Sequence, residues 1–131
     1  MKLAYVDTSV LVAIAFGEPG HERLSRQLRG CDRLFSSNLL EAEFRATLAR
    51  EAVEEDAERL LSPITWIFPE RELTEEFRKV LSHGTLRGAD LWHLACALYL
   101  SKAVGGLLFS TLDEHQNNAA EALGMRSTTQ S

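Results

Sequence analysis

Four short and mostly apolar runs, separated by longer helical patterns, constrain the fold of this chain more than any other feature. The strands that they predict are Leu3–Val6, Arg33–Ser36, Thr65–Phe68 and Leu107–Ser110. Short strands without a polar face are typical of buried parallel sheets, and their helical connections are expected to be right-handed crossovers. The pattern predicts an α/β fold in three layers, α/β/α, around a central and mainly parallel sheet of four to five strands.

Seven helices are expected around this sheet. They are Val10–Phe16, His21–Leu28, Ser37 or Asn38 to about Val53, Glu54–Leu61, Glu70–Leu81, Gly88–Ser101 and Asp113–Leu123. The helix Gly88–Ser101 is apolar on nearly every side, which is typical of a central buried element. The 131 residues fit one domain, residues 1–131, in which residues 126–131 are expected to form a frayed tail.

The chain is acidic, with 19 Asp and Glu residues against 14 Lys and Arg residues and a net charge of −5. This balance argues against a protein that grips nucleic acid through bulk positive charge, but not against one that acts on it through carboxylate-bound metal ions. Cys31 and Cys96 are too few for a disulfide framework or a structural zinc site. The longest apolar run, Val10–Phe16, is well short of the roughly 18 residues of a membrane span, so a cytoplasmic protein with no membrane contact is expected.

Two acidic residues follow predicted strands. Asp7 comes directly after the first strand, and Asp113 comes three residues after Ser110. Open parallel sheets carry their sites at the carboxyl ends of the strands, so both residues are site candidates. Each could instead cap the helix that follows it, and Asp113 to Gln116 has the spacing of a capping box. The two roles can coexist because a carboxylate has two oxygens.

Asp90 is the only acidic residue within Gly88–Ser101. An unpaired carboxylate is costly to bury, so Asp90 requires a cation, a cluster of hydrogen bonds or a raised pKa. His93, three residues further on, is the nearest polar candidate and is expected to pack or to support the site. The alternative is that Asp90 lies in water at the entry of the helix, near the positive end of its dipole.

The helix that begins at Ser37 or Asn38 carries two glutamates that could join these acids. Glu41 precedes Arg45 by four residues, which is the preferred orientation for a solvated ion pair on a helix. Glu43 borders the apolar side of the helix and is the better candidate, while a contribution from Glu41 stays open. Acids from distant segments suit a hard cation such as Mg²⁺ or Mn²⁺, and such sites hydrolyse phosphodiesters through a metal-activated water.

Four segments of the chain, in order, resemble PIN-domain proteins and especially the bacterial VapC-type toxins. The segments are Tyr5 to Leu11, Ser37 to Leu48, Leu86 to Ala95 and Ser110 to Gly124. The resemblance implies a PIN-like fold and a metal-dependent endoribonuclease, the toxin of a toxin–antitoxin pair. It also implies the residues of the site. Asp7, Glu43, Asp90 and Asp113 would be the catalytic and metal-binding acids, and the hydroxyl groups of Ser9 and Thr111 would support them.

The same resemblance implies the partners: an RNA substrate such as tRNA or ribosomal RNA, a cognate antitoxin protein and a second copy of the chain in a homodimer. Two alternatives stay open at this point. One is a catalytically inactive PIN-like module that only engages an antitoxin-like partner. The other is a receiver-type phosphoacceptor domain, although Pro69 and Glu70 stand where its acceptor Asp would follow the middle strand, and no Lys follows Lys102.

Overall fold

All four predicted strands lie in one parallel sheet of the computed structural model, which describes residues 1–53 and 56–128. The strands are β1 (Leu3–Val6), β2 (Arg33–Ser37), β3 (Ile64–Ile67) and β4 (Leu108–Ser110), in the spatial order β3-β2-β1-β4. Tyr5 of β1 pairs with Phe35 of β2 on one side and with Phe109 of β4 on the other. The central strand β1 therefore delivers the residues that follow it to the middle of the carboxyl edge.

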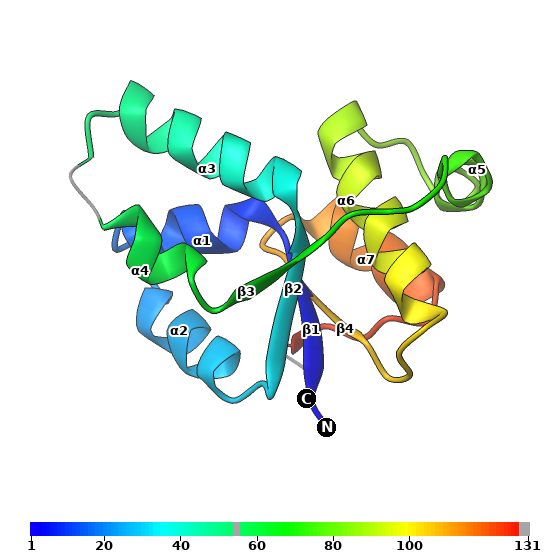
Figure 1. The fold of residues 1–131 in the computed structure, drawn as a ribbon, viewed down its shortest axis with the longest axis horizontal. Coiled ribbons are helices and arrows are strands. Elements are labelled where there is room, and N and C mark those ends of the chain that lie inside the picture. Colours follow the sequence, from blue (N-terminus) through cyan, green and yellow to red (C-terminus); the bar gives the residue numbers. More distant parts are fainter. Residues whose placement is uncertain (54–55, 129–131) are drawn as a thin grey trace.

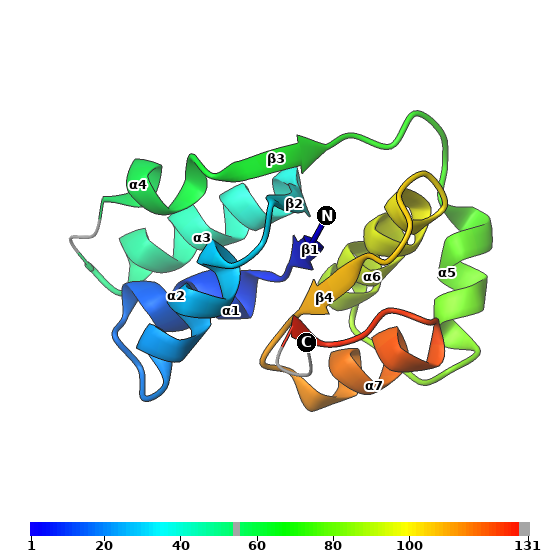
Figure 2. The ribbon, with the colours of Figure 1, turned by 90° about the horizontal axis from the view of Figure 1, so that it is seen from below.

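Helices cover both faces of the sheet, which confirms the predicted three-layer α/β/α architecture (Figure 1). The helices are α1 (Thr8–Ala15), α2 (His21–Arg29), α3 (Asn38–Arg50), α4 (Ala57–Leu61), α5 (Thr74–Leu81), α6 (Gly88–Ser101) and α7 (Glu114–Ala122). Helices α1 to α4 lie on one face and α5 to α7 on the other, an arrangement that the orthogonal view repeats (Figure 2). No helix in the described ranges is long and apolar enough to cross a membrane.

Alternating side chains of β1 feed two separate hydrophobic cores. Tyr5 packs with the core under α5, α6 and α7, whereas Val6 packs with the core under α1 to α4. Both side chains are fully buried. The period of two along a strand explains this division, because neighbouring side chains point to opposite faces of the sheet. Cys96 lies in the first core as a free thiol.

Several helix ends differ from the sequence prediction for local reasons. The helix predicted from Glu70 begins instead at Thr74. Before it, the Glu70 N–H donates to the Tyr99 hydroxyl of α6 at 3.3 Å, so this bond is not available to a helix. Helix α3 ends at Arg50 rather than near Val53, since Ala52 has a positive φ of 51°. The start predicted for the next helix, Glu54, lies outside the described residues, and α4 begins after its N-cap Asp56.

The end of the chain runs beside β4 further than the sequence suggested. The Phe109 N–H donates to the Arg126 carbonyl at 2.8 Å, and Phe109 forms a parallel bridge with Ser127. Ser127 and Thr128 are buried. Residues 126–128 of the predicted frayed tail are therefore held against the open edge of the sheet, and residues 129–131 lie outside the described part.

Glu76 is a buried carboxylate that the amphipathic pattern of α5 did not reveal. Its side chain has no exposed surface, and both of its oxygens are bound. Arg71 donates to them at 2.9 and 2.6 Å, and Lys102 donates at 3.0 Å from the end of α6. The hydrogen bonds from Arg71 and then from Lys102 lower the pKa of Glu76 to about 2, against the opposing effect of burial. This carboxylate ties the loop before α5 to α6.

We expect Glu76→Gln to lower the free energy of unfolding at pH 7 by about 1.5–3 kcal/mol, the contribution of hydrogen bonds to charged groups. The folded pKa lies below the ordinary value of 4.5, so the stabilisation is present above pH 4.5 and is lost as the pH falls toward about 2. Urea unfolding across this range measures the difference between the two proteins. The exposed neighbour Glu75→Gln is the control, and a difference that stays constant with pH would contradict the assignment.

Candidate active site

Asp7 is the most buried of the four predicted site acids, with 3% of its surface exposed. It follows β1 and is the N-cap of α1. Its Oδ2 atom accepts hydrogen bonds from the Ser9 hydroxyl at 2.7 Å, the Ser9 N–H at 3.4 Å and the Thr111 hydroxyl at 3.0 Å. The two predicted supporting residues thus hold one oxygen of Asp7. Its Oδ1 atom has no hydrogen bond within residues 1–53 and 56–128, and lies 3.9 Å from His93 Nε2.

Asp113 is the N-cap of α7, as its spacing to Gln116 predicted. Its Oδ1 atom accepts the Gln116 N–H at 2.9 Å. Its own N–H donates to the Thr111 hydroxyl oxygen at 3.0 Å, and the neighbouring Leu112 N–H donates to the Ser9 hydroxyl oxygen at 3.1 Å. Ser9 and Thr111 therefore bond to Asp7 and to the loop after β4 at the same time, which fixes Asp113 relative to Asp7.

Asp90 lies in the first turn of α6 and is partly exposed, because the helix begins only two residues before it. Its Oδ1 atom accepts a hydrogen bond from the Gln116 side-chain amide at 3.0 Å. Burial, and then the negative charges of Asp7 and Asp113, raise the pKa of Asp90 above its ordinary 3.8. The negative charges of Asp7 and Asp113 therefore act on Asp90, although the three residues come from different segments.

The two glutamates of α3 have different surroundings. Glu41 accepts hydrogen bonds from Arg45 at 2.8 Å and Asn38 at 2.9 Å, which confirms the predicted ion pair on the surface. Glu43 instead accepts, at Oε1, the Thr8 hydroxyl at 2.7 Å and His93 Nε2 at 3.0 Å. The hydrogen bond from His93 is the main cause that lowers the pKa of Glu43. Glu43, unlike Glu41, also contributes to the repulsion on Asp90.

We call Asp7, Glu43, Asp90 and Asp113 the acidic cluster. Hydroxyl, amide and imidazole groups hold one oxygen of each carboxylate, and no Lys or Arg in the described ranges is hydrogen-bonded to any of them. Unbalanced carboxylate oxygens are the donors that Mg²⁺ and Mn²⁺ prefer, so the cluster fits such an ion in its chemistry. As the side chains stand, no three His, Cys, Asp or Glu residues in the described ranges are gathered closely enough to hold one. Binding would have to draw them together.

Four residues near the cluster were missed or underrated by the sequence analysis: Tyr5, Thr8, His93 and Gln116. Gln116 was read as part of a capping box, yet its side chain bonds to Asp90 rather than to the start of its own helix. Thr8 begins α1, and its hydroxyl donates to Glu43. Only His93 carried a signal in the sequence, because it is polar within an apolar helix.

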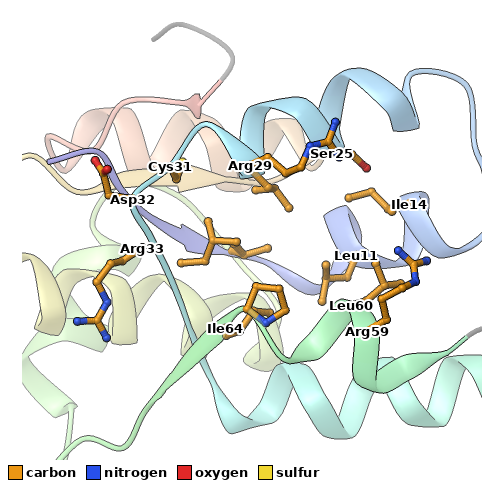
Figure 3. A pocket seen from close by; sticks show the side chains of 14 residues that line it. Leu11, Ile14, Ser25, Arg29, Cys31, Asp32, Arg33, Arg59, Leu60 and Ile64 are labelled. Atoms are coloured by element: carbon orange, nitrogen blue, oxygen red, sulfur yellow. The ribbon is translucent and has the colours of Figure 1, made fainter.

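A separate cavity of about 420 Å³ lies on the face of the sheet that α1 to α4 cover, between α2 and α4 (Figure 3). Leu11 and Ile14 of α1 form part of its apolar wall, and Arg29 and Arg59 extend beside it. None of the acids in the cluster lines this cavity. The cavity and the acidic cluster are therefore distinct features of the molecule.

Comparison with known proteins identifies the family. The chain matches the PIN domain over residues 4–122 and belongs to this family. It is 35% identical to ribonuclease VapC45 of Mycobacterium tuberculosis strain CDC 1551 / Oshkosh over 140 residues, covering 96% of this chain and 94% of the relative. Ribonuclease VapC46 of strain ATCC 25618 / H37Rv is 32% identical over 127 residues, with 95% of each chain covered. The resemblance to VapC-type PIN proteins is confirmed, and the receiver-type alternative is set aside.

We expect Asp90→Asn to stabilise the metal-free protein at neutral pH. The folded pKa of Asp90 lies above its ordinary value, so the ionised carboxylate destabilises the fold above that folded pKa, and this cost fades as the pH falls toward 3.8. Urea unfolding in EDTA should show a higher midpoint for the variant at pH 7 and a smaller gap near pH 4.

Glu114→Gln is the matched control, because Glu114 is exposed in the first turn of α7 and reports only the loss of a helix-dipole interaction. If Asp90→Asn is no more stable than the wild type at pH 7, the result would contradict the raised pKa of Asp90.

Proposed function

We propose that this chain is a toxin-type endoribonuclease that hydrolyses RNA phosphodiester bonds at the acidic cluster with Mg²⁺ or Mn²⁺. The observation that carries the proposal is the set of hydrogen bonds by which Thr111 joins Asp7 to the Asp113 N–H and Gln116 joins Asp113 to Asp90, with no Lys or Arg in the described ranges bonded to these acids. Membership of the PIN family and relatives named ribonuclease VapC support the same reaction.

The residues of the chain have separate tasks in this mechanism. Asp7, Asp90 and Asp113 would hold the cation through the oxygens that their hydrogen bonds leave free, with Glu43 beside them. When bound, the cation would supply positive charge for the scissile phosphate and lower the pKa of a coordinated water. Ser9 and Thr111 hold Asp7 in place through Oδ2. Glu43, kept ionised by its bond from His93, would orient the attacking water.

The proposed partners follow from the family resemblance. The substrate would be a structured RNA, tRNA or ribosomal RNA, and the regulator would be a cognate antitoxin that covers the acidic cluster. Residues 1–131 would form one PIN-like domain that acts as a homodimer in the cytoplasm. The competing proposal is an inactive PIN-like module that only engages an antitoxin-like partner.

Purified protein should cleave tRNA or ribosomal RNA in Mn²⁺ and not in EDTA. We expect Asp7→Asn and Asp90→Asn each to lose a factor of about a hundred or more in rate, because a metal site contributes several kcal/mol to the transition state and about 1.4 kcal/mol is tenfold.

Asp32→Asn is the control for that experiment, since Asp32 precedes β2 and lies at the amino edge of the sheet. Cleavage that survives both site substitutions would contradict the assignment of the cluster. A wild type that binds Mn²⁺ but cleaves neither RNA would favour the inactive module.

Mn²⁺ should also stabilise the folded protein. At a concentration of about one hundred times its dissociation constant, an ion that binds only the folded state adds about 2.7 kcal/mol to the free energy of unfolding. We expect this gain in the wild type and its loss in Asp7→Asn, as measured by urea unfolding with and without Mn²⁺. An equal gain in both proteins would place the ion elsewhere.

A further inference from the structure

A chain of buried hydrogen bonds runs behind Glu43 and links three elements of the fold. The Ser37 N–H, at the end of β2, lies 3.1 Å from the Tyr5 hydroxyl of β1. The Tyr5 hydroxyl lies 2.8 Å from His93 Nδ1 of α6, and His93 Nε2 lies 3.0 Å from Glu43 Oε1. Tyr5 is fully buried, and His93 is 1% exposed.

The chemistry of the two ends fixes the direction of every bond in this chain. A backbone N–H can only donate, so the Tyr5 oxygen accepts from Ser37. An ionised carboxylate can only accept, so His93 donates to Glu43 from Nε2. In a neutral imidazole with its proton on Nε2, the ring accepts at Nδ1, and the Tyr5 O–H is then the donor there.

A further observation agrees with this direction. Burial raises the pKa of Tyr5, so the hydroxyl keeps the proton that it donates. The Tyr5 ring is already stacked on Phe109, with centroids 5.6 Å apart and planes at 5°. A phenylalanine would pack as well in that stack, so the distinct contribution of the Tyr5 hydroxyl lies in its bonds to His93 and to the Ser37 N–H.

This chain of hydrogen bonds determines how Glu43 is held. Both of its donors, Thr8 and His93, bind Oε1, and Oε2 has no hydrogen bond in the described part of the protein. We propose that Tyr5 and His93 are positioning residues that hold Glu43 through Oε1 and so keep Oε2 available to the acidic cluster. The inference rests on the proposed function for the task of Glu43, but the direction of the chain does not depend on it.

Nitrogen-15 NMR of the imidazole rings tests the direction of these hydrogen bonds in the metal-free protein. We expect His93 to carry its proton on Nε2 and to accept at Nδ1. In Tyr5→Phe, the Nδ1 signal should move because it loses its donor, while the signals of His21, His83 and His115 stay in place. A proton on Nδ1 in the wild type, or an Nδ1 signal that Tyr5→Phe leaves unmoved, would overturn the proposal.

Mn²⁺ titration by calorimetry tests the positioning role. We expect His93→Leu to weaken Mn²⁺ binding about tenfold, as is usual when a partner of a metal-binding group is removed. His93→Gln should restore most of the affinity, because its amide can still donate to Glu43. Tyr5→Phe should weaken binding in the same direction and covers the case in which His93→Leu does not fold. Tyr99→Phe is the matched control, since the other tyrosine lies away from the cluster and only accepts a bond from Glu70.

The outcomes separate this inference from the proposed function. If the wild type binds Mn²⁺ and all of these variants bind it equally well, the positioning role is overturned while the metal site stands. If the wild type binds no Mn²⁺, the proposed function fails, and the NMR result alone decides whether the oriented chain exists.

Discussion

The hydrogen bonds of Ser9, Thr111 and Gln116, which hold three carboxylates at one edge of the sheet, are the interactions on which the site depends. Each acid of the cluster has one oxygen bound by a hydroxyl, amide or imidazole group, and none is hydrogen-bonded to a Lys or Arg in the described part of the chain. Glu76 offers the contrast within the same molecule, because Arg71 and Lys102 neutralise it and lower its pKa to about 2. Glu76, which serves only the fold, is thus paired with two cations. The cluster is left with negative charge that a divalent cation could offset.

The parallel sheet brings these acids together from distant parts of the sequence. Asp7 follows the central strand β1, Asp113 follows its neighbour β4, and Glu43 lies on the helix that leaves β2. Helices α3 and α6 stand on opposite faces of the sheet (Figure 2). The His93 side chain of α6 nevertheless lies 3.0 Å from Glu43 of α3. The site is therefore a consequence of strand order, and a change in the order of β1, β2 and β4 would separate its parts.

Much of this was predictable from sequence because it depends on local pattern. Short apolar runs locate the strands, and the spacing of Glu41 and Arg45 separates the surface glutamate from Glu43. The bonds of Gln116 to Asp90 and of Tyr5 to His93 were not predictable, because each joins segments that only the tertiary fold brings together. The late start of α5 and the pairing of residues 126–128 with β4 have the same origin.

The net charge of −5 changes meaning once the cluster is set apart, since fifteen acids then face fourteen bases. The acidity belongs largely to the proposed metal site rather than to the general surface. Anomalous scattering from crystals soaked in Mn²⁺ tests this account most directly. It predicts a peak bound by oxygens of Asp7, Asp90 and Asp113. Full Mn²⁺ occupancy at another place, or no peak at saturating Mn²⁺, would contradict it.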